Sequence, residues 1–182
     1  GLFICNFESK AVGTCDSLKA CLGNALTQTV TSGKSSHYVD VLPSGSLFSY
    51  SNKLTVEFWF KPQKQNGKIQ FLAGIWGPAD DANDVWAIYI DESDNLCFEI
   101  NHPGFNLKQI DNTIAKASIA SNYDKWMHGA FVFDGQVSTA IIYIDGSVVG
   151  GATNSSFPIS FLKYPERADL SLQIGGSNAI SN

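Results

Sequence analysis

The sequence lacks any long hydrophobic run. No stretch of its 182 residues approaches the ~18 consecutive apolar residues that a transmembrane helix needs. Basic residues are also few: 12 Lys and Arg stand against 17 Asp and Glu, which gives a formal net charge of −5. Proteins that hold nucleic acid through its phosphates normally carry a basic surface. We therefore expect no membrane insertion and no nucleic-acid partner.

Cysteine is scarce, and no CxxC pair is present, so a metal site built on sulfur is not expected. The even number and the close pair Cys15 and Cys21 favour disulfides and a secreted or extracellular location, although buried free thiols would also explain these residues. Among the pairings open to four cysteines, we predict Cys15–Cys21, which closes a short loop, and Cys5–Cys97, which joins the other two. Asn154 begins an Asn-Ser-Ser triplet and is a candidate glycosylation site, although such triplets also occur by chance.

An amphipathic helix of useful length is missing too. Instead, short apolar or alternating segments are separated by turn residues along the chain. The expected strands are residues 2–7, 37–42, 54–61, 68–76, 85–91, 96–101, 114–119, 130–133, 140–144, 148–149 and 170–174. This pattern is typical of an all-β, two-sheet antiparallel sandwich, and we expect a single domain over residues 1–182.

Two Asp-Gly pairs mark the clearest turns. Asp145-Gly146 lies between apolar segments, and a type I′ hairpin turn needs the positive φ angles that Asp-Gly tolerates. Asp134-Gly135 ends the preceding strand. The sequence therefore predicts a tight hairpin at Asp145-Gly146 and a second turn at Asp134-Gly135.

Six motifs occur in a telling order: HYVDVLPSGSL, LTVEFWFKP, WAIYID with NLCFEI, KWMHGAFVFDG, IYIDG and LSLQIGG. Together they cover most of residues 37–176, and they resemble a laminin G-like, pentraxin-related domain of the concanavalin A-like lectin/glucanase superfamily. The resemblance implies a jelly-roll sandwich and extracellular recognition of a glycan or glycoprotein.

Two departures from the resemblance matter. The cysteines that bridge two strands of true pentraxins are missing here. The family's closing strand, of the type G-x-I-D-E-V, does not appear before Asn182. We expect the domain to lack that last strand, and a neighbouring chain or domain to complete the sheet by strand addition.

A calcium site is the metal site that the sequence favours. Hard cations such as Ca²⁺ take clustered carboxylate and carbonyl oxygens. The resemblance implies a calcium site in an acidic loop and, as a second candidate, an acid at a strand edge. The alternative is that the acidic loop is a solvated turn that binds no metal. The candidate metal ligands are Asp80, Asp81, Asn83 and Asp84 in the loop, and Asp40 at the strand edge. Asn178 lies where the family supplies further binding residues, but no acid stands beside it.

Aromatic residues offer a candidate ligand-binding surface. Alternation within residues 54–61 puts Phe58 and Phe60 on one face and Trp59 on the other. Trp59, Trp76 and Tyr89 are candidates for stacking on sugar rings. The alternative is that these rings fill the second face of the sandwich.

Catalytic patterns are missing. Glycosidases of this superfamily carry two carboxylates on one strand, of the type E-x-D-x-x-E, whereas Glu57 and Glu99 each stand alone on theirs. His37, His102 and His128 belong to no nucleophile motif, and we expect His128 to pack in the core.

The expected function is a non-enzymatic, extracellular carbohydrate-binding or adhesion module. A structural protein-binding module of a larger assembly and an unrecognised glycoside hydrolase are the alternatives.

Overall fold

We analysed a computed structural model, which describes residues 2–3, 39–41, 53–64, 67–75, 86–100, 113–154 and 172–175. These segments form strands and turns. The strands are β1 (Leu2–Phe3), β2 (Val39–Val41), β3 (Lys53–Phe60), β4 (Gln70–Ile75), β5 (Trp86–Ile90), β6 (Asn95–Ile100), β7 (Thr113–Ser118), β8 (Met127–Asp134), β9 (Thr139–Ile144), β10 (Ser147–Thr153) and β11 (Leu172–Ile174). Within the described segments, no helix is long and apolar enough to cross a bilayer.

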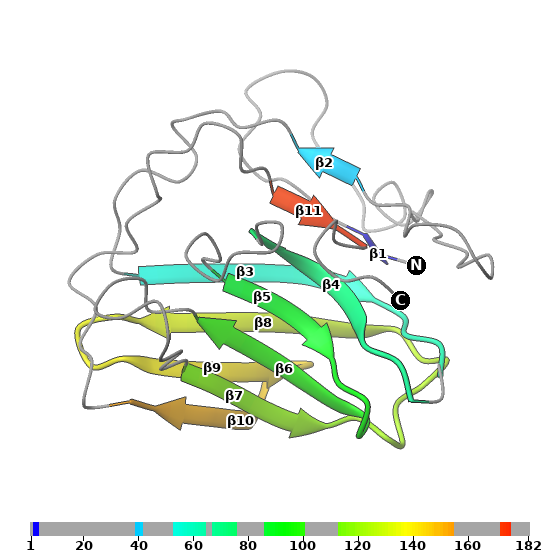
Figure 1. Cartoon of the computed structure of the whole chain (residues 1–182). Helices are drawn as coiled ribbons and strands as arrows, with labels where there is room; N and C mark the ends of the chain where they lie inside the picture. The colour runs from blue at the N-terminus through cyan, green and yellow to red at the C-terminus, as the bar shows by residue number, and fades with distance from the viewer. Residues whose placement is uncertain are drawn as a thin grey trace, which may run out of the picture.

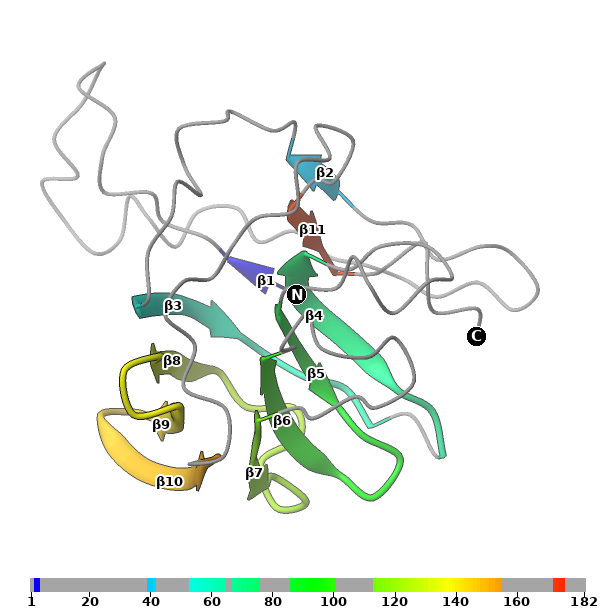
Figure 2. The ribbon, with the colours of Figure 1, turned by 60° about the vertical axis from the view of Figure 1, so that its left-hand side comes forward.

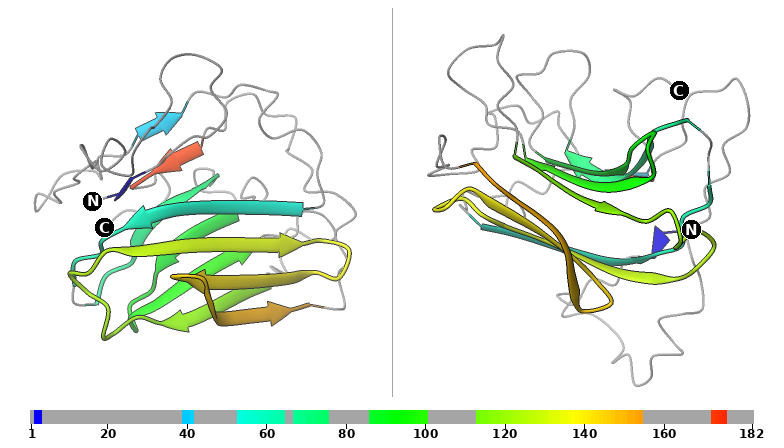
Figure 3. Two further views of the ribbon diagram at one scale, coloured as in Figure 1. Left: turned by 180° about the vertical axis from the view of Figure 1, so that it is seen from behind. Right: turned by 90° about the horizontal axis from the view of Figure 1, so that it is seen from below.

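The strands lie in two antiparallel sheets. One has five strands in the order β1-β3-β8-β9-β10, and the other has six in the order β2-β11-β4-β5-β6-β7. Figure 1 shows the arrangement, and the right-hand view of Figure 3 shows the sheets as two layers. The predicted all-β, two-sheet antiparallel sandwich is confirmed. The weak strand expected at residues 114–119 is β7.

Strand β3 follows the alternation that its sequence predicts. It pairs with β8 along its whole length, from Lys53 opposite Asp134 to Phe60 opposite Met127. Phe58 and Phe60 are buried, whereas Trp59 between them is exposed. One face of the five-stranded sheet therefore lies in the core, and the other lies outside.

Aromatic rings join the two sheets at the centre of the core. Phe131 of β8 stacks on Phe58 of β3, with ring centroids 5.4 Å apart. It also meets Phe98 of β6, in the other sheet, edge to face at 5.8 Å. Phe98 and Phe131 are both fully buried. Edge-to-face and offset contacts at these distances are the favourable aromatic geometries.

The hairpin between β9 and β10 has the predicted turn. Asp145 has φ 50° and Gly146 has φ 80°, as a type I′ turn requires. The turn is also tied to the start of β8. Asp145 N donates to the carbonyl oxygen of His128 at 2.8 Å, and Asp145 Oδ1 accepts a hydrogen bond from His128 N at 2.9 Å. The second predicted turn, at Asp134-Gly135, is confirmed as the connection from β8 to β9.

The sheets also meet along one edge, where β10 lies against β7 (Figure 2). Gly150 makes this approach feasible. A Cβ at Gly150 would collide with the backbone carbonyl of Lys116 and contact the Ala117 side chain. The absence of a side chain lets the edge strands of the two sheets come together.

Candidate functional site

An aromatic pair lies on the outer face of the five-stranded sheet, the sheet in front in the left-hand view of Figure 3. Trp59 of β3 stands directly opposite His128 of β8 in the register. Their ring centroids are 5.3 Å apart and the planes are tilted by 54°. Trp59 is 40% exposed. The pair therefore offers an apolar ring surface, edged by imidazole nitrogens, that faces outward.

Glu57 adds a carboxylate to this pair. It is the preceding outward-facing residue of β3, and its Oε2 lies 4.0 Å from His128 Nε2. The Glu57 side chain is 57% exposed and that of His128 is 31% exposed. We call Glu57, Trp59 and His128 the Trp59 cluster. It combines one exposed indole with hydrogen-bonding groups on two neighbouring strands.

The prediction that His128 packs in the core is wrong. Residues alternate along β8, and the inward positions on either side of His128 belong to Met127 and Gly129, which are buried. His128 therefore points to the outer face, beside Trp59. The sequence held the signal, because Trp126, Met127 and His128 begin a strand whose inward residues can be counted back from Phe131 and Phe133.

Tyr89, the second aromatic candidate within the described segments, lies on the other sheet. Its hydroxyl donates to Glu99 Oε2 at 2.8 Å. Glu99 is only 7% exposed. Desolvation by burial, together with the negative charge of Glu99 and this hydrogen bond, raises the pKa of Tyr89. Tyr89 is thus engaged with a buried carboxylate, unlike the open ring of Trp59.

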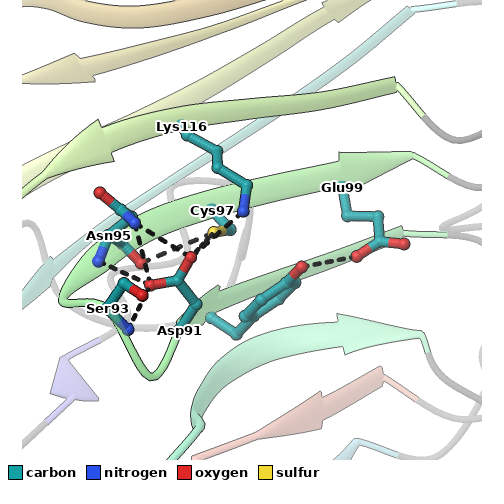
Figure 4. A network of polar contacts seen from close by, with 7 residues as sticks. Asp91, Ser93, Asn95, Cys97, Glu99 and Lys116 are labelled. Carbon is teal, nitrogen blue, oxygen red and sulfur yellow. Dashed lines mark hydrogen bonds and ion pairs between the residues drawn. The ribbon is translucent and has the colours of Figure 1, made fainter.

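Neighbouring residues form a polar network at the turn between β5 and β6 (Figure 4). Asp91 Oδ1 accepts from the backbone nitrogens of Ser93 and Asn95, each at 2.9 Å. Asp91 Oδ2 accepts from Lys116 Nζ of β7 at 3.2 Å. Desolvation opposes ionisation of Asp91, but the hydrogen bonds from Asn95, Lys116 and Ser93 outweigh it and lower the pKa to about 2. Because protein donors occupy this carboxylate, its role is to hold the hairpin.

Cys97 is a free, buried thiol, which corrects the predicted Cys5–Cys97 bridge. Cys97 lies on β6 in the six-stranded sheet, and its Sγ is 3.6 Å from Asp91 Oδ2. Cys5 lies outside the described segments. Desolvation and the charge of Asp91 raise the pKa of Cys97 to about 12. An unreactive structural thiol follows from this environment.

Several predicted residues fall outside the described segments. They are Asp80, Asp81, Asn83 and Asp84 of the acidic loop, Trp76, Asn178, and the cysteines Cys5, Cys15 and Cys21. The calcium loop and the Cys15–Cys21 bridge therefore stay predictions. Within the part of the chain that the structure describes, no group of three or more His, Cys, Asp or Glu side chains could hold a metal ion.

Two further candidates lie on described strands or beside them. Asp40 is the central residue of β2, opposite Gln173 of β11. Asn154 directly follows β10, and its backbone nitrogen donates to the carbonyl oxygen of Ser138 at 2.9 Å. Neither Asp40 nor Asn154 belongs to the Trp59 cluster.

The glycosidase pattern offers Glu99 only as half of a catalytic pair and does not predict its environment. In the structure it is a buried carboxylate on the outer face of the six-stranded sheet. A signal was available. The segment WAIYI is continuously apolar, which is typical of a strand covered on both faces, and Glu99 pairs with Ala87 of that segment.

Comparison with models of known protein families identifies the family of this chain. A laminin G family model, described as the concanavalin A-like lectin/glucanases superfamily, matches residues 32–181. The chain belongs to this superfamily. The predicted laminin G-like fold is thereby confirmed. No curated protein matches the chain in sequence.

Solved structures give the same fold for this superfamily member. The carbohydrate-binding module CBM40 of the Ruminococcus gnavus IT-sialidase aligns with a TM-score of 0.55 at 12% identity, covering 83% of this chain and 79% of that one. The same module bound to α2,3-sialyllactose aligns with a TM-score of 0.54 at 13% identity, covering 77% and 73%. At this identity the likeness establishes the architecture.

Proposed function

We propose that this chain is a non-catalytic carbohydrate-binding module, and that the Trp59 cluster is part of its glycan site. The observation that carries the proposal is the exposed ring of Trp59, with His128 and Glu57 beside it. Tryptophan rings that combine an apolar face with a polar edge are common in recognition sites.

The chemistry of the cluster suits a sugar ring. The C–H face of a pyranose packs on an indole, while its hydroxyl groups need donors and acceptors close to the ring. Around Trp59, the His128 imidazole can donate or accept and the Glu57 carboxylate can accept. The glycan-bound structural neighbour, and a superfamily that includes lectins, support this assignment.

The non-catalytic part of the proposal rests on placement. Glu57 lies on the outer face of the five-stranded sheet and Glu99 on the outer face of the six-stranded sheet. A glycosidase needs its two carboxylates about 5–10 Å apart on one side of the substrate. These two glutamates lie on opposite sides of the sandwich, so they cannot work as a pair. Asp145 lies on the same sheet as Glu57, and the reducing-sugar assay described below tests whether that pair hydrolyses a glycan.

Binding to a glycan array, followed by titration calorimetry with the best ligand, tests the proposal. Trp59→Ala should weaken binding about fivefold to thirtyfold, because a stacked ring contributes roughly 1–2 kcal/mol. Val137→Ala is the matched control, since Val137 is also exposed and lies in the turn at the opposite end of β8. This control should bind like the parent chain.

The rival functions give different results. A structural or adhesive module that recognises only protein would bind no glycan on the array. A glycosidase would release reducing sugar from a polysaccharide that it binds. Either result would overturn the proposal, whereas glycan binding that depends on Trp59 and leaves the ligand intact supports it.

We also propose that the domain is extracellular, that Cys15 and Cys21 form a disulfide, and that the metal it binds is Ca²⁺. Cysteine usage and the acidic loop support this setting. Peptide mapping without reduction tests the bridge, and a free thiol at Cys15 in the secreted protein would contradict it.

A further inference from the structure

Two carboxylates surround His128 in the Trp59 cluster. On one side, Glu57 Oε2 lies 4.0 Å from His128 Nε2. On the other, Asp145 Oδ1 accepts from the backbone nitrogen of His128 at 2.9 Å, while Asp145 N donates to its carbonyl oxygen at 2.8 Å. The aspartate of the β9–β10 turn is therefore fixed beside the aromatic pair. A ligand stacked on Trp59 would lie beside the Glu57 carboxylate, while the Asp145 carboxylate is bound to the backbone of the neighbouring strand, β8.

From this arrangement we infer that the site selects uncharged saccharides and disfavours acidic ones such as sialosides and uronides. The inference rests on the proposed glycan-binding function and adds the class of glycan. Glu57 is well exposed, so an acid group on a sugar packed over Trp59 would lie near the Glu57 carboxylate. Like charges about 5 Å apart in water repel enough to weaken binding roughly threefold to tenfold.

The expected preference differs from the ligand of a structural neighbour, α2,3-sialyllactose, which carries a carboxylate. Two lysines lie close in sequence to the residues of the Trp59 cluster, Lys125 before His128 and Lys61 after Trp59. Lys125 donates its ammonium group to the carbonyl oxygen of Ser121 at 3.0 Å. Lys61, two residues after Trp59, is half-buried. Among the described lysines, Lys61 is the nearest to Trp59 in sequence, and its positive charge would offset the negative charge of Glu57, so the experiment includes it.

The test compares matched pairs of glycans that differ only by an acid group, such as lactose with α2,3-sialyllactose and glucosides with glucuronides. At about 20 mM salt, each acidic partner should bind about threefold or more weakly than its neutral counterpart. At about 0.5 M salt the difference should shrink, because the repulsion is between exposed charges and is screened. At low salt, Glu57→Gln should reduce the difference in affinity between the acidic and the neutral glycan of each pair.

Glu92→Gln is the matched control. It removes the same charge from an exposed residue at the β5–β6 turn of the other sheet. If the preference for neutral glycans comes from the site, Glu92→Gln leaves it unchanged. If Glu92→Gln reduces the difference in affinity between neutral and acidic glycans as much as Glu57→Gln does, the preference reflects the overall charge of the protein and the inference is wrong.

The remaining outcomes separate the inference from the proposed function. Acidic partners that bind as well as neutral ones, in a manner that Trp59→Ala abolishes, would overturn the selectivity and leave the glycan site intact. A loss of that acidic binding in Lys61→Gln would identify the residue that outweighs the carboxylates. Absence of binding to any glycan would instead overturn the proposed function.

Discussion

At the scale of single residues, the carboxylate of Asp91 binds several donors at once. It accepts from two backbone amides of its own turn, from the Asn95 side chain and from Lys116 on the next strand. Its side chain is only 16% exposed. Such a carboxylate stabilises the fold in its charged form, because every one of these groups is a donor.

This environment predicts a pH dependence of stability. The pKa of Asp91 falls from its ordinary value of 3.8 to about 2 in the folded chain. A lowered folded-state pKa gives stability that is present above pH ~4 and is lost as the pH falls toward ~2. The gain is at most about 2 kcal/mol. Asp91→Asn should therefore lower the free energy of unfolding near neutral pH, and the difference from the parent should shrink below pH ~4.

Chemical denaturation at several pH values measures this difference, with Glu92→Gln as the control on the same turn. Glu92 is exposed, so its substitution should change stability little at any pH. An Asp91→Asn variant whose deficit stays constant down to pH ~2 would show that ionisation of Asp91 is not what stabilises the hairpin.

At the scale of strands, the contact between β10 and β7 depends on Gly150. Its missing side chain lets β10 lie against the Lys116 carbonyl of β7. Gly150→Ala should force these edge strands apart and destabilise the chain by about 1–3 kcal/mol, the usual cost of overpacking. The midpoint of a denaturant titration measures the loss.

Gly151→Ala is the control for this change. The neighbouring glycine is exposed, and a Cβ there would meet only the Ala140 carbonyl oxygen, at an ordinary 3.4 Å. Its substitution should be near neutral, since it adds no clash and reduces the freedom of the unfolded chain. Equal losses in the two variants would mean that β-propensity, rather than the contact with β7, governs this strand.

Strand positions could be predicted from the sequence because they depend on local patterns. Alternation placed Phe58 and Phe60 inside and Trp59 outside, and the Asp-Gly pair fixed the turn at Asp145. The partners across the sheets could not be predicted in the same way. That β10 meets β7, or that His128 faces Trp59, depends on contacts between distant segments, which periodicity does not encode. The Cys5–Cys97 error has the same origin.

At the scale of the whole molecule, the sandwich presents two different outer faces. The five-stranded sheet exposes Trp59 with half-exposed neighbours. The six-stranded sheet buries residues on its outer face as well, among them Cys97 and Glu99. The exposed ring of Trp59 is why the proposed glycan site lies on the first face. The polar network around Asp91 on the second sheet belongs to the stability of the fold.

Calcium would act on the stability of the molecule as a whole, since a ligand that binds only the folded state shifts the unfolding equilibrium. If the acidic loop with Asp80, Asp81 and Asp84 binds Ca²⁺, the ion should add about 2.7 kcal/mol at a free concentration of about a hundred times Kd. For a chain of this size that corresponds to a rise in Tm of roughly 5–10 °C. Differential scanning calorimetry in chelator and in millimolar calcium measures this rise in Tm.

The Asp81→Ala/Asp84→Ala double variant should lose the rise in Tm with calcium, and Asp40→Ala should retain it. A full response in the double variant would move the site to other residues, and a Tm that calcium leaves unchanged in the parent chain would rule out a site of useful affinity.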